Sequence, residues 1–215
     1  MKITRIALSL ALAMVVMFSA SLAIPANAAV IAPPEYAEPL HARDVDNEVE
    51  IVKVKFESVP LYDQTDFPNI PYSQGTIYTS GCGITCMAMV ASYILDEPIS
   101  PATLGLEYNK SASNNVSRML NAADGLGIEY EKPENWNEMK EALESGKIAI
   151  VLVNANSIFT DYGHFIVLTG ITEDGKFMVN DPWGPNYDRY PDGFENGFEE
   201  WQILQGYSGG WTFEK

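Results

Sequence analysis

The sequence predicts an α+β domain in which an N-terminal helical part, carrying a helix that begins at a cysteine, packs on a C-terminal antiparallel β-sheet. Between about residues 83 and 145, apolar and small residues recur with helical spacing, and polar caps and glycines mark the segment ends. From residue 148 onward, runs of β-branched and aromatic residues alternate with turn residues. Helices followed by strands, rather than alternating with them, are typical of α+β domains.

The N-terminus has the pattern of a secretory signal peptide. Lys2 and Arg5 precede an apolar run from residue 6 to about 24, and the run ends in Pro-Ala-Asn-Ala, an Ala-x-Ala cleavage site. We therefore expect residues 1–28 to be removed and the mature protein to be secreted, without stable membrane insertion. An uncleaved membrane anchor is the alternative.

Charge and composition restrict the partners. The formal net charge is −16, and loss of residues 1–28 removes two positive charges, leaving 11 Lys and Arg against 29 Asp and Glu, or −18. Such a surface repels nucleic acid and anionic lipids, so we expect neither as a partner. Residues 29–50 are acidic and rich in proline, which predicts a flexible leader or an inhibitory pro-segment. The folded domain is expected over residues 51–215. We expect the protein to be a monomer.

Four helices are predicted in the first half of this domain. The first runs from about Gly83 to Leu95 and stops before Glu97-Pro98, because the residue before a proline is disfavoured in a helix. It is apolar around most of its circumference, which predicts a buried central helix. The others begin at polar caps and end near glycines; they cover residues 100–108, 114 or 115 to 123, and 135–145.

The second half predicts a sheet. Residues 148–153 form a continuous apolar run, typical of a strand buried on both faces. Residues 163–171 and 177–181 flank a Glu-Asp-Gly-Lys turn and predict an antiparallel hairpin. Further expected elements are a first strand over 50–56, a long loop over 65–80, a short helix over 198–204 and a last strand over 209–213.

Cys82 is the candidate nucleophile. It lies between Gly81 and Gly83 at the start of the central helix, where the unpaired N–H groups and the helix dipole favour a thiolate. A cysteine that only fills space is the alternative. The second cysteine, Cys86, lies one helical turn further on, so a disulfide would distort that turn; if it forms, we expect a reversible inactive state.

A cysteine nucleophile needs a base and a group that orients the base. The chain has two histidines, and His41 lies in the expected leader, which leaves His164 at the start of a buried strand. A structural core histidine is the alternative. Asp181 ends the strand that pairs with the strand of His164, so it is the candidate orienting group, with Asn180 as the second choice. Asp181 could also be an ordinary turn residue before a proline.

The oxyanion of such a reaction needs N–H donors. We expect one from the backbone of Cys82 and one from a glutamine side chain, either Gln64 or Gln74. No cofactor is expected. The single plausible histidine and two cysteines four residues apart do not make a zinc site.

Four segments together resemble the ordered motifs of the C39-like family of papain-fold cysteine peptidases. They span about residues 59–213 and are Val-Pro-Leu-Tyr-Asp-Gln (59–64), Ser-Gly-Cys-Gly-Ile-Thr-Cys-Met-Ala-Met-Val (80–90), Gly-His-Phe-Ile-Val-Leu-Thr-Gly (163–170) and Val-Asn-Asp-Pro-Trp-Gly (179–184). Two positions depart from the family: Ile84 stands where proline is usual, and Cys86 where a small residue is common.

The resemblance implies a papain-like fold with Cys82 as nucleophile, His164 as base, Asp181 as orienting group and Gln64 in the oxyanion hole. The leading hypothesis is a secreted cysteine peptidase or amidase that hydrolyses a peptide or protein substrate through a thioacyl-enzyme. Two alternatives stay open: a transglutaminase-like acyltransferase, and a catalytically silent module that binds peptides or cell-surface groups. The best-known family members trim leader peptides inside transporters, and we carry no substrate over from them.

Overall fold

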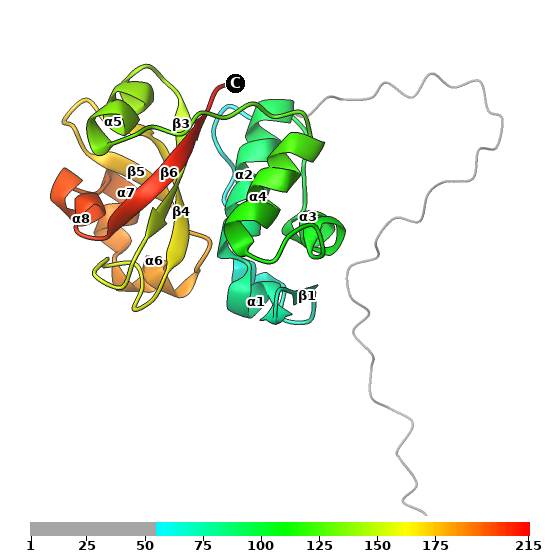
Figure 1. Ribbon diagram of the computed structural model, residues 1–215. Helices are drawn as coiled ribbons and strands as arrows, with labels where there is room; N and C mark the ends of the chain where they lie inside the picture. The colour runs from blue at the N-terminus through cyan, green and yellow to red at the C-terminus, as the bar shows by residue number, and fades with distance from the viewer. Residues whose placement is uncertain (1–54) are drawn as a thin grey trace, which may run out of the picture. The chain divides into compact units, whose positions relative to one another are not determined.

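A four-stranded antiparallel sheet lies at the centre of the computed structural model, which describes residues 55–215 (Figure 1). The strand order is β5-β4-β3-β6. The strands are β3 (Ile148–Val153), β4 (His164–Ile171), β5 (Phe177–Asn180) and β6 (Tyr207–Phe213). The prediction of these four strands is confirmed, with ends that differ by at most two residues.

Helices cover both faces of this sheet. Successive side chains of a strand point to opposite faces, so Ile148 and Ile150 of β3 pack in one apolar core while Ala149 and Val151 pack in the other. The first core holds the helices α2 (Cys82–Leu95), α3 (Pro101–Tyr108) and α4 (Asn115–Gly125), and the second holds α5 (Trp136–Glu144) and α8 (Glu200–Leu204) (Figure 1). The expected packing of helices on the sheet is confirmed. The helix predicted over 135–145 is present, and it covers the face of the sheet opposite α2, because a strand that is apolar on both faces needs a second cover.

The predicted helices are present, and polar side chains begin three of them. Asn114 accepts a hydrogen bond from the Ser117 N–H, and Asn135 accepts one from the Glu138 N–H. Ser100 likewise accepts from the Ala102 N–H.

Several short elements were not predicted. The expected loop 65–80 contains the 3-10 turn η1 (Gln64–Asp66), the hairpin of β1 (Pro71–Tyr72) and β2 (Gly75–Thr76), and the helix α1 (Ile77–Ser80). Tyr72 and Ile77 in this stretch are fully buried, so tertiary packing rather than local periodicity holds it. Two further short helices, α6 (Pro185–Arg189) and α7 (Pro191–Asn196), each begin with a proline.

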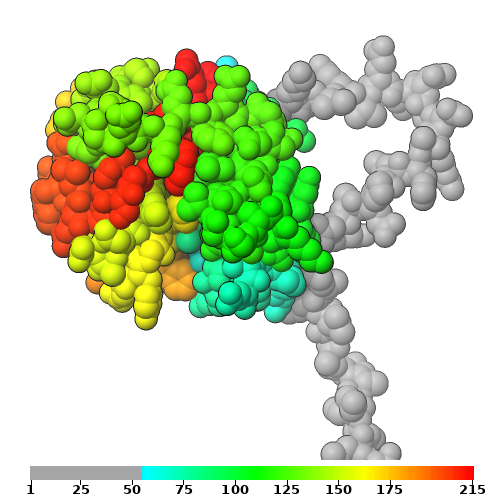
Figure 2. Space-filling view, viewed as in Figure 1, coloured from blue at the N-terminus to red at the C-terminus, as the bar shows by residue number. Residues whose placement is uncertain are grey.

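The predicted signal peptide 1–28 and leader 29–50 lie outside the described residues, as does most of the predicted strand 50–56. The last two residues of that strand, Lys55 and Phe56, are described and are not in a strand. In the space-filling view, part of the C-terminal strand (red) is visible beside the green helical layer of the domain (Figure 2). Within residues 55–215, no helix has the length and apolar character needed to cross a membrane.

Candidate active site

Cys82 is the first residue of α2; the glycine before it is sterically required, and the glycine after it lies in tight contact with the sheet. A Cβ on Gly81 would lie 2.5 Å from the carbonyl oxygen of Ile77, which is too close for any side chain. A Cβ on Gly83 would lie 3.2 Å from the ring of Phe165 in β4. The glycines thus allow α1 to turn directly into α2 and allow α2 to approach the sheet. The thiol of Cys82 is half-buried and lines a cavity of about 540 Å³.

His164 and Asp181 meet where the hairpin of β4 and β5 brings their strand ends together. His164 is the first residue of β4, and Asp181 follows β5 directly. Although 17 residues separate them, the imidazole Nε2 and the carboxylate Oδ1 are 2.7 Å apart. His164 is 7% exposed and Asp181 is 0% exposed. Because Nε2 contacts Asp181, Nδ1 is the ring nitrogen left for the sulfur of Cys82.

The carboxylate of Asp181 is held by further donors. The backbone N–H of Trp183 donates to Oδ1 at 2.8 Å, and the side-chain amide of Asn186 donates to Oδ2 at 2.7 Å. The same amide nitrogen donates to the carbonyl of Phe159 at 2.8 Å. A buried carboxylate needs such partners to stay charged. Asn186 was missed from the sequence, where it has no signal beyond its place shortly after Asp181.

The pKa values of Cys82 and His164 are shifted in opposite directions. Burial alone raises the pKa of the Cys82 thiol, but its hydrogen bond with His164 and the charge of the imidazolium outweigh burial and lower it. Burial alone lowers the pKa of His164, but the hydrogen bonds with Asp181 and Cys82 raise it to about 10. These opposite shifts favour a thiolate beside an imidazolium over a neutral thiol beside a neutral imidazole.

These directions predict a pH window for Cys82 chemistry. The thiolate forms above the lowered pKa of Cys82, and the imidazolium persists below the raised pKa of His164. Turnover should therefore rise at a pH below the ordinary thiol pKa and fall only when His164 deprotonates in the alkaline range. The rate of Cys82 alkylation by iodoacetamide, measured at a series of pH values by intact-protein mass spectrometry, gives the acid limb of this profile, where the thiolate forms. A Cys82 that titrates like a free thiol would contradict this prediction.

Gln64 lines the same cavity as Cys82, and Gln74 does not. Gln64 is 4% exposed, and its Nε2 donates to the carbonyl of Tyr78 at 2.7 Å. A longer contact of 3.4 Å joins Nε2 to the carbonyl of Ile77. Gln74 is exposed in the turn between β1 and β2. Of the two glutamines considered for the oxyanion hole, only Gln64 is therefore near the thiol.

The remaining candidates from the sequence are placed elsewhere. The amide of Asn180 donates to the carbonyls of Val59 and Pro60 and does not contact His164. Cys86 is a buried free cysteine whose Sγ donates to the carbonyl of Phe165 at 3.4 Å. Burial, followed by the nearby charge of Cys82, raises the pKa of Cys86 well above its ordinary value. His41 lies outside the described residues.

Aromatic side chains form part of the cavity wall. Tyr78 of α1 and Trp183, which follows β5, both line the cavity. Their rings are 5.5 Å apart and meet edge to face, so they join the helical side to the sheet side. Phe159 and Tyr162, in the loop before His164, complete the aromatic lining. Tyr162 is 80% exposed, which leaves its ring available at the rim.

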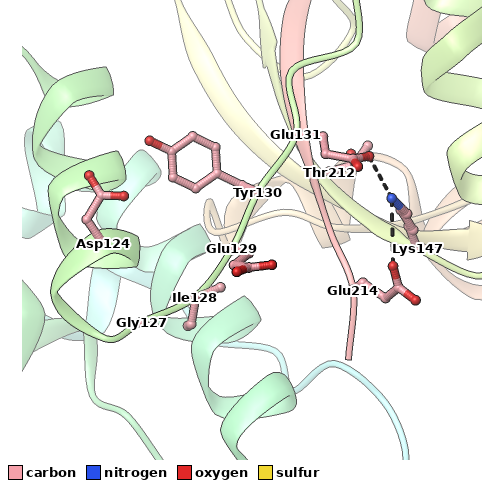
Figure 3. Close-up of a pocket in the computed structure, with 9 residues that line it drawn as sticks. All are labelled: Asp124, Gly127, Ile128, Glu129, Tyr130, Glu131, Lys147, Thr212 and Glu214. Carbon is pink, nitrogen blue, oxygen red and sulfur yellow. Dashed lines mark hydrogen bonds and ion pairs between the residues drawn. The ribbon is translucent and has the colours of Figure 1, made fainter.

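A second cavity, of about 710 Å³, lies away from this constellation (Figure 3). Its carboxylates include Glu131 and Glu214, both within 4 Å of Lys147, at 2.6 Å and 3.7 Å. None of the candidate catalytic residues lines it. Among residues 55–215, no three His, Cys, Asp or Glu side chains gather as a metal site would require.

Comparisons with known proteins agree with the resemblance found in the sequence. The family model of the Peptidase_C39 like family matches residues 56–209, more than half of the chain. No curated protein matches the chain.

Two solved structures are similar to it. A protein from Bacillus anthracis described as a C39-like peptidase is 16% identical, with a TM-score of 0.47, over 76% of this chain and 98% of that one. The peptidase domain of Streptococcus ComA, described as a bi-functional ABC transporter involved in quorum sensing, is 17% identical, with a TM-score of 0.42, over 63% and 90%. Both TM-scores lie below 0.5, so nothing further is inferred from these two structures. On the strength of the family match, the chain belongs to the Peptidase_C39 like family.

Proposed function

We propose that this protein is a secreted cysteine peptidase or amidase that hydrolyses a peptide or amide bond in a peptide or protein substrate. One arrangement carries the proposal: the thiol of Cys82 at the start of α2, the imidazole of His164, and the buried carboxylate of Asp181, 2.7 Å from Nε2. Family membership supports the reaction class, and the signal-peptide pattern of residues 1–28 supports the location.

The geometry supports the following steps. The thiolate of Cys82 attacks the amide carbonyl carbon, and the carbonyl oxygen takes up the negative charge. The backbone N–H of Cys82 donates to that oxygen, and so does Gln64 Nε2, which gives up its longer contact with the carbonyl of Ile77 to do so. His164 then gives the Nδ1 proton to the leaving amine, the C–N bond breaks, and a thioester with Cys82 remains.

Hydrolysis of the thioester completes the cycle. The now neutral His164 takes a proton from water, and the resulting hydroxide attacks the thioester carbonyl carbon. The C–S bond breaks, the carboxylic acid product leaves, and Cys82 returns as a thiolate beside the imidazolium. Asp181 holds the ring through Nε2 throughout, so that Nδ1 stays directed at the reacting atoms.

A peptide-library digest tests this proposal. The protein without residues 1–28 is incubated with the library under reducing conditions, and the products are identified by mass spectrometry. We expect new termini that carry the mass of water. Products that carry the mass of an added amine would indicate acyl transfer. No product, together with saturable peptide binding, would indicate the silent binding module and would overturn the proposal.

A further inference from the structure

The segment that carries Gln64 crosses from the helical side of the unit to the sheet side. We call residues 59–64 the crossing segment. At the helical side, Val59 is buried in the core that contains α2. The hydroxyl groups of Tyr62 and Ser92, the latter in α2, are 3.0 Å apart. The position of Gln64 relative to Cys82 therefore depends on how this segment is held at both ends.

Hydrogen bonds fix the crossing segment to the residues that surround Asp181. The amide of Asn180 donates to the carbonyls of Val59 and Pro60, at 3.0 Å and 3.3 Å. The backbone N–H of Gln64 itself donates to the carbonyl of Pro182 at 2.8 Å. These contacts place the backbone of Gln64 against the loop that carries Asp181.

Gly184 adds a close approach in the same place. Its N–H lies 3.3 Å from Oδ1 of Asp63, and a Cβ on Gly184 would lie 1.8 Å from Oδ2 of Asp63. A side chain at this position would have to displace the carboxylate of Asp63. The crossing segment and the loop 180–184 thus form one interlocked unit rather than two neighbouring loops.

We propose that Asn180 is a positioning residue for the oxyanion hole, acting through Gln64. This inference rests on the proposed function. Asn180 and Asp181 are adjacent, and their side chains have different partners: Asp181 binds the imidazole, whereas Asn180 holds the crossing segment. Two neighbouring residues thereby set the positions of the base and of the oxyanion donor. Small misplacements of a catalytic group cost large factors in rate.

Replacement of Asn180 by aspartate tests the role, because Asn180→Asp keeps the shape and removes both N–H donors. We expect kcat to fall about tenfold with KM little changed, since the oxyanion contact is made in the transition state. The pH profile of Cys82 alkylation should stay as in the wild type. The matched control is Asn121→Asp. Asn121 is half-buried, and its amide also donates to the carbonyl of a residue outside its own helix, Ser111. This variant should leave kcat unchanged.

A double-mutant cycle separates positioning from general loosening of the fold. In a Gln64→Ala background, Asn180→Asp should cost nothing further, because the donor that it positions is gone. A tenfold loss that persists in that background overturns the proposal, as does an unchanged kcat in the single variant. If Asn180→Asp does not fold, Asp63→Ala takes its place, because it removes the acceptor of the Gly184 N–H. We then expect kcat to fall in the single variant and to fall no further in the Gln64→Ala background.

A readout that does not depend on turnover separates this inference from the proposed function. The side-chain amide signals of Gln64 in a ¹⁵N-labelled sample should shift in Asn180→Asp and stay unchanged in Asn121→Asp. Unshifted Gln64 signals would overturn the positioning role even in an active enzyme. Shifted signals in a protein that cleaves no peptide would support the positioning role and leave only the proposed function refuted.

Discussion

Replacement of Cys82 by alanine is expected to abolish turnover, with a fall in kcat of about 10⁶-fold, the size of the loss when a serine protease loses its nucleophile. The sulfur forms the covalent bond to the substrate on which both steps of the proposed cycle depend. The thiol is half-buried at the start of α2, so the change removes a single atom without opening the core. Labelling by a thiol-directed peptide mimic, followed by intact mass, should disappear together with product formation in the library digest.

Cys86→Ala is the matched control for this prediction. Cys86 is fully buried, and its raised pKa keeps it a thiol, so it should not react in the wild type. The control variant should label and turn over like the wild type, with some loss of thermal stability because a buried sulfur has been removed. Labelling that survives in Cys82→Ala and disappears in Cys86→Ala would show that Cys86, and not Cys82, is the reactive cysteine.

The second large effect is expected from Asp181→Asn, which should lower kcat/KM by between about 10² and 10⁴. The carboxylate accepts from His164, Trp183 and Asn186 at once, and an amide in its place cannot accept from all of them. The ring then loses the partner that fixes Nε2. Circular dichroism of the folded variant separates this loss from unfolding.

Asp181→Asn should also narrow the pH range over which the enzyme turns over its substrate. Asp181 contributes to the raised pKa of His164, so its loss lowers that pKa and moves the alkaline limb to lower pH. A less stable imidazolium stabilises the thiolate less, so the pKa of Cys82 rises and the acid limb moves to higher pH. Asp188→Asn, a change of the same kind at an exposed residue of α6, should move neither limb. Unchanged limbs in Asp181→Asn would contradict the assigned role.

The sheet and the main helices could be predicted because their signals are local. A continuous apolar run such as 148–153 fits a strand buried on both faces, and the polar caps at Ser100, Asn114 and Asn135 mark where helices begin. The pairing of β4 with β5 also follows from a short turn. That pairing is what made the contact between His164 and Asp181 predictable across 17 residues.

The remaining features depend on contacts between residues far apart in the chain. The choice between Gln64 and Gln74 is made by the packing of the crossing segment on α2 and on the loop 180–184, which no local pattern records. Asn186 is recognisable only once α6 places its amide between Asp181 and Phe159. That these residues act in catalysis stays a prediction until the variants above are measured.

The arrangement of the two sulfurs in α2 has a consequence for oxidative damage. Side chains four apart in a helix have Cβ atoms about 5–6 Å apart, whereas a disulfide needs roughly 3.5–4.5 Å. The chain contains no third cysteine. A sulfenic acid formed at Cys82 by peroxide therefore has no resolving thiol within the protein, and only a small external thiol could restore it before further, irreversible oxidation.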